Sequence, residues 1–527
     1  MHLAVSVISA IISATSLTIT EPVEGEAYRT GSLFLKVIVE NDNRVPDSVC
    51  FSLNETPQDS IPRLSTDWPT YMQNYRNTGY SMSPAPSTPE VLWTAPICSE
   101  THDFPTPAVV NGTVYYPQDG YGTGDTLFAL DAATGEIRWT HRVGYTDDTI
   151  TLCRGLLYSS SDSLFCMDAA TGEDVWHFCP EDDLYPTGSP VVTGGVVYFL
   201  TTALSTDTTV VHASNAETGE LIWTRGLSAP MESSIAWEEG ILYIPLYTYG
   251  LNGDAATSLF ALDCDDGSTI WSSDHCEGGY WDSSPCIVED LIYIGGNDGF
   301  LHAFDKEDGT LVWQSLLHPD AVWSEPTPAY NNFRVFTGCC NWRQQNYVGA
   351  FDSKTGIQLW NWTDRIALHG SFGLAEGLAF MGASFMDTIY AFDQITGEVV
   401  WSFGIDAPKS GPEGWDGFQS SPSITDGILY LPSTDGNLYA LGSGMKFTYS
   451  DETEIGSGVY SLAVTSYEGG NAVAADTVDF VVSRWAAKSS SGASEEPHGV
   501  IDYMRYLIQS IRLSGQFNGC KANCIPC

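Results

Sequence analysis

Two adjacent cysteines, Cys339 and Cys340 in the segment TGCCNW, have a spacing that could support chemistry, because neighbouring cysteines can close a strained vicinal disulfide. Three other segments, YWDSSP, VWSEPTP and GWDGFQSSP, each carry a tryptophan beside or near a carboxylate. Aromatic faces suit sugars or a flat cofactor, and carboxylate oxygens suit Ca²⁺. The candidate ligand-binding residues are therefore Trp281, Asp282, Trp323, Glu325, Trp415 and Asp416.

A repeat must position these residues. The phrase LFALDAATGEIRW at 127–139 returns along the chain in variants such as LFALDCDDGSTIW and IYAFDQITGEVVW. Successive copies end on tryptophans that lie 37 to 48 residues apart. A period of this length, with alternating apolar residues and Gly/Pro punctuation, indicates four short strands per unit, as in a propeller blade. The tryptophans, which we expect to be structural, are Trp93, Trp139, Trp176, Trp223, Trp271, Trp313, Trp360 and Trp401.

Each unit reads as strands A to D. A hairpin of strands A and B follows a Ser/Thr-Pro start, strand C is LFALD or a variant, and strand D carries the tryptophan. The D-x-x-T-G segment between C and D is a corner rather than a catalytic motif, since its Asp can accept backbone N–H bonds and its Gly allows a positive φ. Eight strand-C phrases occur, but the last, at 437–441, has no tryptophan strand after it. We therefore expect 91–93 to close the ring as the outer strand of an eighth blade.

The repeat, Leu/Val-x-Ala-x-Asp/Asn-x-x-Thr/Asp-Gly-x-x-x-Trp, resembles that of the pyrroloquinoline-quinone (PQQ) propellers. This family includes quinoprotein dehydrogenases and a non-enzymatic outer-membrane assembly lipoprotein. The segment DWPTYMQNYRNTGYS at 67–81 also resembles the one that precedes such propellers. The resemblance implies that the repeat tryptophans dock between neighbouring blades. It also implies a vicinal disulfide of Cys339 and Cys340 above a quinone, as in PQQ alcohol dehydrogenases.

The B–C and D–A loops of a propeller share one face, opposite the C–D corners. The candidate tryptophans and acids precede strands A, so they could ring the mouth of the central funnel together with the cysteine pair. The alternative is that they only pack blades. The full quinone and Ca²⁺ ligand sets and the aspartate base of quinoproteins cannot be matched, and a C-x-x-C-H haem motif is missing. Ca²⁺ is therefore the cofactor that the acids allow, and PQQ is not expected.

The flanks predict a second domain into which the propeller is inserted. Strand-like segments on both sides together suggest an immunoglobulin-like β-sandwich, with Tyr460 resembling a tyrosine corner. A short amphipathic helix and a cysteine-rich tail follow, and this helix with Cys520, Cys524 and Cys527 could join copies into an oligomer. The fold class is thus all-β apart from that helix. The expected domains are a signal peptide at 1–16, sandwich halves at 17–56 and 444–485, linkers at 57–90 and 486–499, the propeller at 91–443, and the helix with tail at 500–527.

Composition limits the function classes. With 66 acidic and 21 basic residues the formal charge is −45, which repels nucleic acid. The apolar run at 3–14 indicates an export signal, and no other segment is apolar enough to cross a membrane. Thirteen cysteines in an exported chain suggest disulfides. The sequence thus favours an exported cell-surface platform, without enzymatic activity, that binds protein or glycan partners at the propeller face. The alternatives are a Ca²⁺-dependent PQQ dehydrogenase and a carbohydrate-binding propeller.

Overall fold

The chain forms two compact units, one of Met1–Ser65 with Lys446–Cys527 and one of Thr66–Met445. In the flanking unit the computed structural model describes the backbone of the strands that lie between 16 and 60 and between 445 and 483. In the other unit it describes residues 66–97, 105–118, 126–144, 149–180, 184–203, 208–229, 231, 233–247, 259–276, 279–280, 282–318, 324, 326–339, 346–364, 370–383, 387–405, 417–442 and 444.

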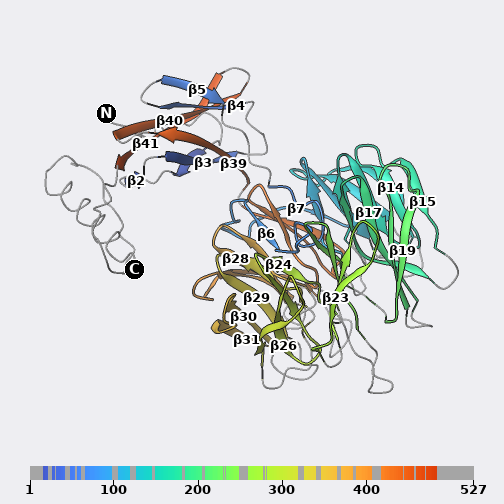
Figure 1. Cartoon of the computed structure of the whole chain (residues 1–527). Helices are drawn as coiled ribbons and strands as arrows, with labels where there is room; N and C mark the ends of the chain where they lie inside the picture. Colours follow the sequence, from blue (N-terminus) through green and yellow to red (C-terminus); the bar gives the residue numbers. More distant parts are fainter. Residues whose placement is uncertain are drawn as a thin grey trace, which may run out of the picture. The chain divides into compact units, whose positions relative to one another are not determined.

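The unit Thr66–Met445 is an eight-bladed propeller whose sheets radiate from a common axis (Figure 1). In each blade the strands follow one another from the innermost, A, to the outermost, D, and all neighbours of this set are antiparallel. Blades one and two contain β8 (Ala108–Val110), β9 (Thr113–Gln118), β10 (Thr126–Asp131), β11 (Ile137–Arg142), β12 (Thr151–Cys153), β13 (Leu156–Ser160), β14 (Leu164–Asp168) and β15 (Asp174–Phe178). Blades three and four contain β16 (Tyr185–Thr193), β17 (Val196–Ala203), β18 (Thr208–Asn215), β19 (Leu221–Leu227), β20 (Ala236–Glu238), β21 (Ile241–Pro245), β22 (Leu259–Asp263) and β23 (Thr269–Ser273).

The remaining blades repeat this plan. Blades five and six contain β24 (Cys286–Val288), β25 (Leu291–Gly295), β26 (Phe300–Asp305), β27 (Leu311–Leu316), β28 (Ala329–Asn331), β29 (Arg334–Cys339), β30 (Asn346–Asp352) and β31 (Gln358–Asp364). Blade seven contains β32 (Gly373–Ala375), β33 (Leu378–Ala383), β34 (Thr388–Asp393) and β35 (Val399–Gly404), to which β6 (Tyr80–Ser81) adds in parallel beside β32. Blade eight contains β36 (Ser423–Thr425), β37 (Ile428–Pro432) and β38 (Leu438–Leu441).

The ring closes as the sequence predicts. The outer strand of blade eight is β7 (Val91–Ala95), which precedes all other blades in the chain and pairs antiparallel with β38. Trp93 lies opposite Ala440, and β36 of blade eight contacts β8 of blade one. First and last parts of the propeller are thus hydrogen-bonded to each other, which removes an open edge.

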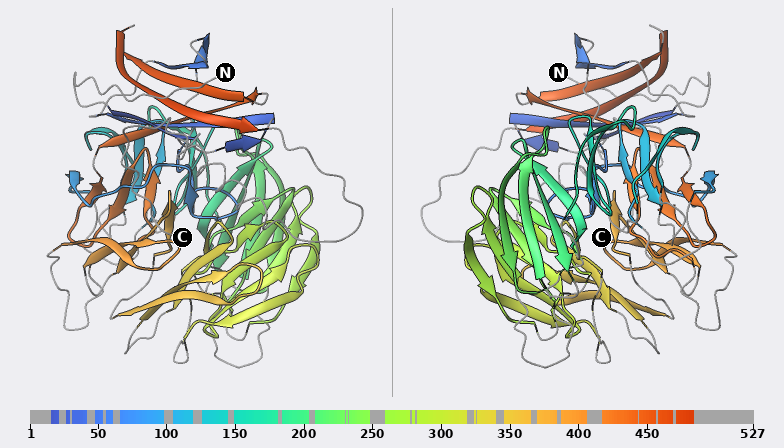
Figure 2. Two further views of the ribbon diagram at one scale, coloured as in Figure 1. Left: turned by 90° about the vertical axis from the view of Figure 1, so that its left-hand side faces the viewer. Right: turned by 90° about the vertical axis from the view of Figure 1, so that its right-hand side faces the viewer.

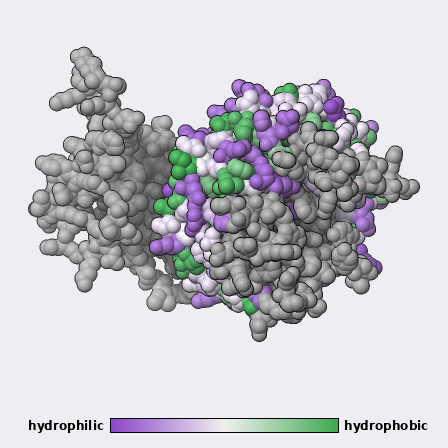
Figure 3. All heavy atoms as spheres, turned by 90° about the horizontal axis from the view of Figure 1, so that it is seen from below, coloured by the Kyte–Doolittle hydropathy of each residue, from purple (hydrophilic) through white to green (hydrophobic). Residues whose placement is uncertain are grey.

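Burial falls from the inner strands to the outer ones. In blade one, β9 is buried along almost its whole length, whereas the residues of β11 are exposed or half-buried, with Ile137 53% exposed. Strand D is the outer edge of each sheet, so only one of its faces packs. Hydrophilic and hydrophobic side chains are accordingly interspersed on the described surface (Figure 3).

One small residue in strand C explains the Ala of the repeat. In blade one Ala129 lies directly opposite Trp139 of strand D, and the register shifts by a bulge one residue later. The same position faces the tryptophan in every blade, occupied by Cys166 in blade two. A small side chain leaves the indole free to lean away from its own sheet and towards the next blade.

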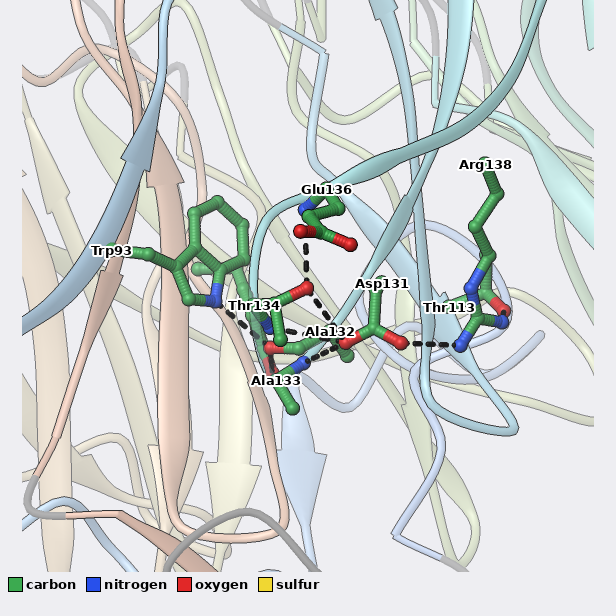
Figure 4. A network of polar contacts seen from close by, with 9 residues as sticks. Trp93, Thr113, Asp131, Ala132, Ala133, Thr134, Glu136 and Arg138 are labelled. Carbon is green, nitrogen blue, oxygen red and sulfur yellow. Dashed lines mark hydrogen bonds and ion pairs between the residues drawn. The ribbon is translucent and has the colours of Figure 1, made fainter.

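The C–D corner receives this indole (Figure 4). At the corner of blade one, Asp131 Oδ1 accepts hydrogen bonds from the backbone N–H groups of Ala133 and Thr134 and from the Thr134 hydroxyl. This fixes the turn and directs the Ala132 carbonyl outward, where it accepts the Trp93 indole N–H at 3.0 Å. The C–D corner of one blade is thus the binding site, or dock, for the tryptophan of the preceding blade.

Each of the repeat tryptophans makes an equivalent bond to the next blade. The indole N–H groups of Trp139, Trp176, Trp223, Trp271, Trp313 and Trp360 donate to the carbonyls of Ala169, Ala216, Cys264, Lys306, Ser353 and Gln394, at 3.0 to 3.1 Å. Blade eight has no C–D corner, since its outer strand comes from elsewhere in the chain. There Trp401 donates instead to the carbonyl of Pro86, just before β7.

The flanking unit combines strands from both ends of the chain, which lie side by side in Figure 2. One sheet has the order β1 (Ser16–Glu21), β3 (Gly31–Asn41), β39 (Met445–Ile455). The other has the order β2 (Ala27–Arg29), β41 (Asn471–Ser483), β40 (Gly458–Glu468), β4 (Ser48–Leu53), β5 (Thr56–Ser60). Tyr460 lies on β40 opposite Phe480. The immunoglobulin type of this unit and the tyrosine corner stay predictions.

The signal peptide at 1–16 falls largely, and the helix with cysteine tail at 500–527 entirely, outside the described residues. The all-β class holds for the part of the chain that is described, where neither a helix nor a helical membrane span occurs.

The corner glycines give the first testable prediction. A Cβ on Gly135 would meet the Trp93 ring at 2.7 Å, whereas one on Gly112, with nearly the same φ of +69° against +73°, would meet nothing within 4 Å. Gly112→Ala should cost about 1–2 kcal/mol for the left-handed backbone, and Gly135→Ala a further 1–3 kcal/mol, roughly, for overpacking. Denaturant midpoints of the two variants measure the difference. Equal losses would show that the indole does not depend on this contact.

Candidate functional site

A collar of hydroxyl side chains surrounds the propeller axis where strands A begin. Each of these Ser or Thr hydroxyls accepts a hydrogen bond from the backbone N–H of its counterpart in the preceding blade, at 2.8 to 3.0 Å. The donor and acceptor pairs are Thr106–Thr149, Ser189–Ser234, Ser234–Ser284, Ser284–Thr327, Thr327–Ser371 and Ser371–Ser421. Blade eight returns to blade one through Ser420, whose hydroxyl donates to the Pro105 carbonyl.

The segment 66–81 fills the middle of the ring on the side of the A–B turns. Its backbone carbonyls accept N–H bonds from the strand-A residue that stands two positions before the A–B turn of one blade after another. These bonds run from Leu152 to Pro69, Trp237 to Tyr75, Ile287 to Arg76, Tyr330 to Thr78 and Leu374 to Gly79. Trp68 and Met72 are fully buried there. We name 66–81 the axial segment, which fixes the blades at their centre.

Tyr71 connects the axial segment to the collar. Its hydroxyl donates to Thr327 Oγ1 at 3.0 Å and lies 3.3 Å from Ser371 Oγ. Burial, with a smaller contribution from the negative charge of Asp282, raises the pKa of Tyr71, so the phenol stays protonated. The collar residues and Tyr71 are thus hydrogen-bonded to one another, and their layer of buried hydroxyls is named the hydroxyl floor.

Asp282 is the predicted funnel residue that the structure describes. It stands two positions before the collar residue Ser284 and has a φ of 59°. A left-handed backbone at a non-glycine residue costs energy and is enriched at functional sites. The negative charge of Asp282 contributes to the raised pKa of Tyr71, so the carboxylate lies in the neighbourhood of that phenol.

The other predicted funnel residues, Trp281, Trp323, Glu325, Trp415 and Asp416, lie outside the described residues, and so does Cys340. Cys339 ends β29 on the loop face and is a buried, free thiol, and burial raises its pKa to about 12. The ring of ligands stays a prediction, whereas the predicted vicinal disulfide is not formed in this structure, in which Cys339 is a free thiol.

Sequence reasoning missed two elements of this site. The Ser/Thr that starts strand A was read only as a strand boundary, although its recurrence before Pro in several blades was the available signal. The tyrosines of strand B were not singled out. The Tyr115 hydroxyl, for example, donates to the same Ala169 carbonyl that receives Trp139, so the dock has two donors.

The eight closed blades with tryptophan-docked corners define a PQQ-repeat β-propeller. The chain belongs to the family described as outer membrane protein assembly factor BamB, whose model matches residues 83–201, 160–321 and 344–477.

The chain is similar to curated proteins that have different activities in their names. Tetrathionate hydrolase of Acidithiobacillus ferrooxidans is 22% identical over 279 residues, covering 47% of this chain and 53% of that protein. The dehydrogenase subunit of the quinone alcohol dehydrogenase of Gluconobacter oxydans is 24% identical over 274 residues, covering 43% of this chain and 33% of that protein. The matches thus span about half or less of the relatives' own length.

Two solved structures share the fold. The quinohemoprotein alcohol dehydrogenase from Comamonas testosteroni superposes with a TM-score of 0.59 at 16% identity, over 72% of this chain and 81% of that one. A europium-containing methanol dehydrogenase gives 0.57 at 15% identity, over 72% of this chain and 98% of that one.

These comparisons correct the functional prediction. The relatives include quinone alcohol dehydrogenases of Gluconobacter oxydans and Gluconacetobacter polyoxogenes. The interpretation as a platform without enzymatic activity is therefore wrong, and the alternative of a PQQ dehydrogenase is the better supported. The sequence argument failed because it required every quinone ligand to be recognisable, whereas loop residues diverge while the blades keep their pattern.

The collar predicts a measurable loss of stability. In Ser284→Ala the buried N–H of Ser234 loses its acceptor, which should cost about 1–3 kcal/mol. Ser272→Ala, at an exposed position on β23, is the matched control and should change the unfolding free energy by less than about 0.5 kcal/mol. Denaturant unfolding of both variants measures their free energies of unfolding. Equal values would mean that this hydrogen bond of the collar contributes nothing to stability.

Proposed function

We propose that the loop face of the propeller is the active site of a quinone-dependent dehydrogenase that oxidises alcohols. The observation that supports the proposal is Asp282, a carboxylate with a left-handed backbone, two positions before the collar residue Ser284 and close enough to Tyr71 to raise the pKa of its phenol. The similarity to quinone alcohol dehydrogenases supports the same reading.

The donor set fits a quinone with a hard cation. Carboxylate oxygens such as those of Asp282 are the ligands that Ca²⁺ prefers. The collar supplies hydroxyls that can hydrogen-bond to the oxygens of a flat ligand, and Tyr71 adds a phenol that burial keeps protonated. When bound, a quinone would accept the two electrons released as an alcohol becomes a carbonyl compound.

The chain's own residues would orient the substrate and move one proton. Asp282 would accept the proton of the alcohol hydroxyl at its carboxylate. The axial segment would keep water from reaching the site through the A–B side of the ring, because Trp68 and Met72 are fully buried there. Export of the chain accords with its similarity to outer-membrane assembly factors.

Asp282→Asn tests the proposal. The wild-type chain should bind PQQ in a Ca²⁺-dependent way in calorimetric titrations and then oxidise ethanol with an artificial electron acceptor. Loss of the proton acceptor should lower kcat/KM by roughly 10²–10⁴-fold. Asp266→Asn changes an exposed acid at a C–D corner, on the opposite face, and should leave kcat/KM unchanged.

Two results would overturn the assignment. One is the absence of Ca²⁺-dependent PQQ binding by the wild-type chain. The other is an Asp282→Asn variant that is as active as Asp266→Asn.

A further inference from the structure

A group of three side chains in blade five combines thiol, carboxylate and imidazole. Cys276 follows β23 in the segment that leads to β24, Asp298 lies in the turn between β25 and β26, and His302 lies on β26. One potential ligand atom of each lies within 4.8 Å of the others. Cys276 and His302 are buried, and the Asp298 side chain is 21% exposed, which leaves a path to solvent.

The three ligand atoms surround Gly296. A Cβ built on Gly296 would lie 2.5 Å from Asp298 Oδ1, 2.6 Å from Cys276 Sγ and 2.9 Å from His302 Nε2. Gly296 has no positive φ, so its backbone conformation does not require glycine. Glycine is needed there because any side chain would collide with the three ligand atoms. Metal–ligand distances at zinc are roughly 2.0–2.3 Å. Three atoms within 4.8 Å of one another therefore need only small side-chain adjustments to share one ion.

A Cys–His–Asp catalytic relay does not fit this geometry. Such a relay needs the carboxylate on one ring nitrogen and the thiol on the other. Here both carboxylate oxygens of Asp298 lie 3.1 Å from His302 Nε2, and Cys276 Sγ lies beside the same glycine as that nitrogen. The thiol and the carboxylate are thus gathered at one nitrogen of the imidazole, as ligands that share one ion would be, and not at its two nitrogens.

The surroundings supply partners for a charged site. The Cys276 thiol donates to the Gly279 carbonyl at 3.1 Å, and the backbone N–H groups of Asn297 and Asp298 favour the thiolate form. The Tyr280 hydroxyl is buried without a hydrogen-bond partner. The Tyr280 hydroxyl could hydrogen-bond to a water molecule bound to the ion.

We propose that Cys276, Asp298 and His302 bind one zinc-class divalent transition metal ion, with a fourth position open to water. A thiolate and a carboxylate carry two negative charges that a dication balances, and sulfur and imidazole ligands select zinc-class ions over Ca²⁺ and Mg²⁺. The ion would tie the segment before β24, which also carries Asp282, to the turn before β26.

Cobalt titration of the full-length, reduced chain tests the site. After chelator treatment and dialysis, Co²⁺ should bind at one equivalent with a thiolate-to-cobalt charge-transfer band, and Zn²⁺ should displace it. Cys276→Ser and His302→Gln should each weaken binding by more than about 100-fold, since even outer-shell changes cost 10–100-fold. Gly296→Ala keeps all three ligands but places a methyl group against each of the three ligand atoms, and should abolish binding while circular dichroism shows the native fold.

Two controls separate this site from other thiols. Cys179→Ser removes an exposed cysteine at the equivalent end of strand D in blade two and should leave the titration unchanged. So should the triple change of Cys520, Cys524 and Cys527 to Ser. A charge-transfer band that survives in Cys276→Ser, or is lost in the tail variant, would overturn the proposal. The absence of the band in the wild-type chain would do so as well. No quinone or alcohol is present, so the outcome is independent of the dehydrogenase assay.

Discussion

The docking of one indole on the next blade's corner is the interaction on which the propeller depends. Each tryptophan N–H in strand D finds its acceptor only on the neighbouring blade, as Trp93 does on Ala132. The corner Asp, or Asn215 in blade three, accepts backbone N–H bonds within its own turn and so holds the corner that presents the carbonyl. A blade is therefore incomplete without its neighbour, and the set is satisfied only when the ring closes. Closure requires β7 and Pro86, from before the first blade, to complete the eighth.

This constraint divides the two faces of the ring. On the corner face, which carries the C–D corners, the side chains serve structure. Its acids and glycines hold the tryptophan docks, and the axial segment fills its centre. The loop face, which carries the B–C and D–A loops, does not take part in these docks. Loop residues can change without disturbing the docks, so chemistry is expected there. The hydroxyl floor, Asp282 and the blade-five cluster all belong to this side of the blades.

Shared blades also explain how relatives with different names can match the same chain. The matches to the family model and to the curated relatives rest on the blade repeat. The residues of this repeat are determined by the packing of the blades and not by a particular reaction. In this chain the residues that could carry chemistry include those of the short segments 274–284 and 296–302. Those segments bring together a thiol, a carboxylate and an imidazole.

The sequence by itself determined the blade count, the strand order within each blade and the closure by 91–93, because each repeat encodes local pairing and a local turn. Only the tertiary structure decided which side chains meet across blades. Asp282 and Tyr71 are 211 positions apart, and the hydrogen-bonded collar pairs are 43 to 50 positions apart. Cys276 and His302 belong to different loops and strands, and no spacing rule joins them. These two residues lie close together because the ring places the segments of neighbouring blades side by side. The sequence of a single repeat does not specify this placement.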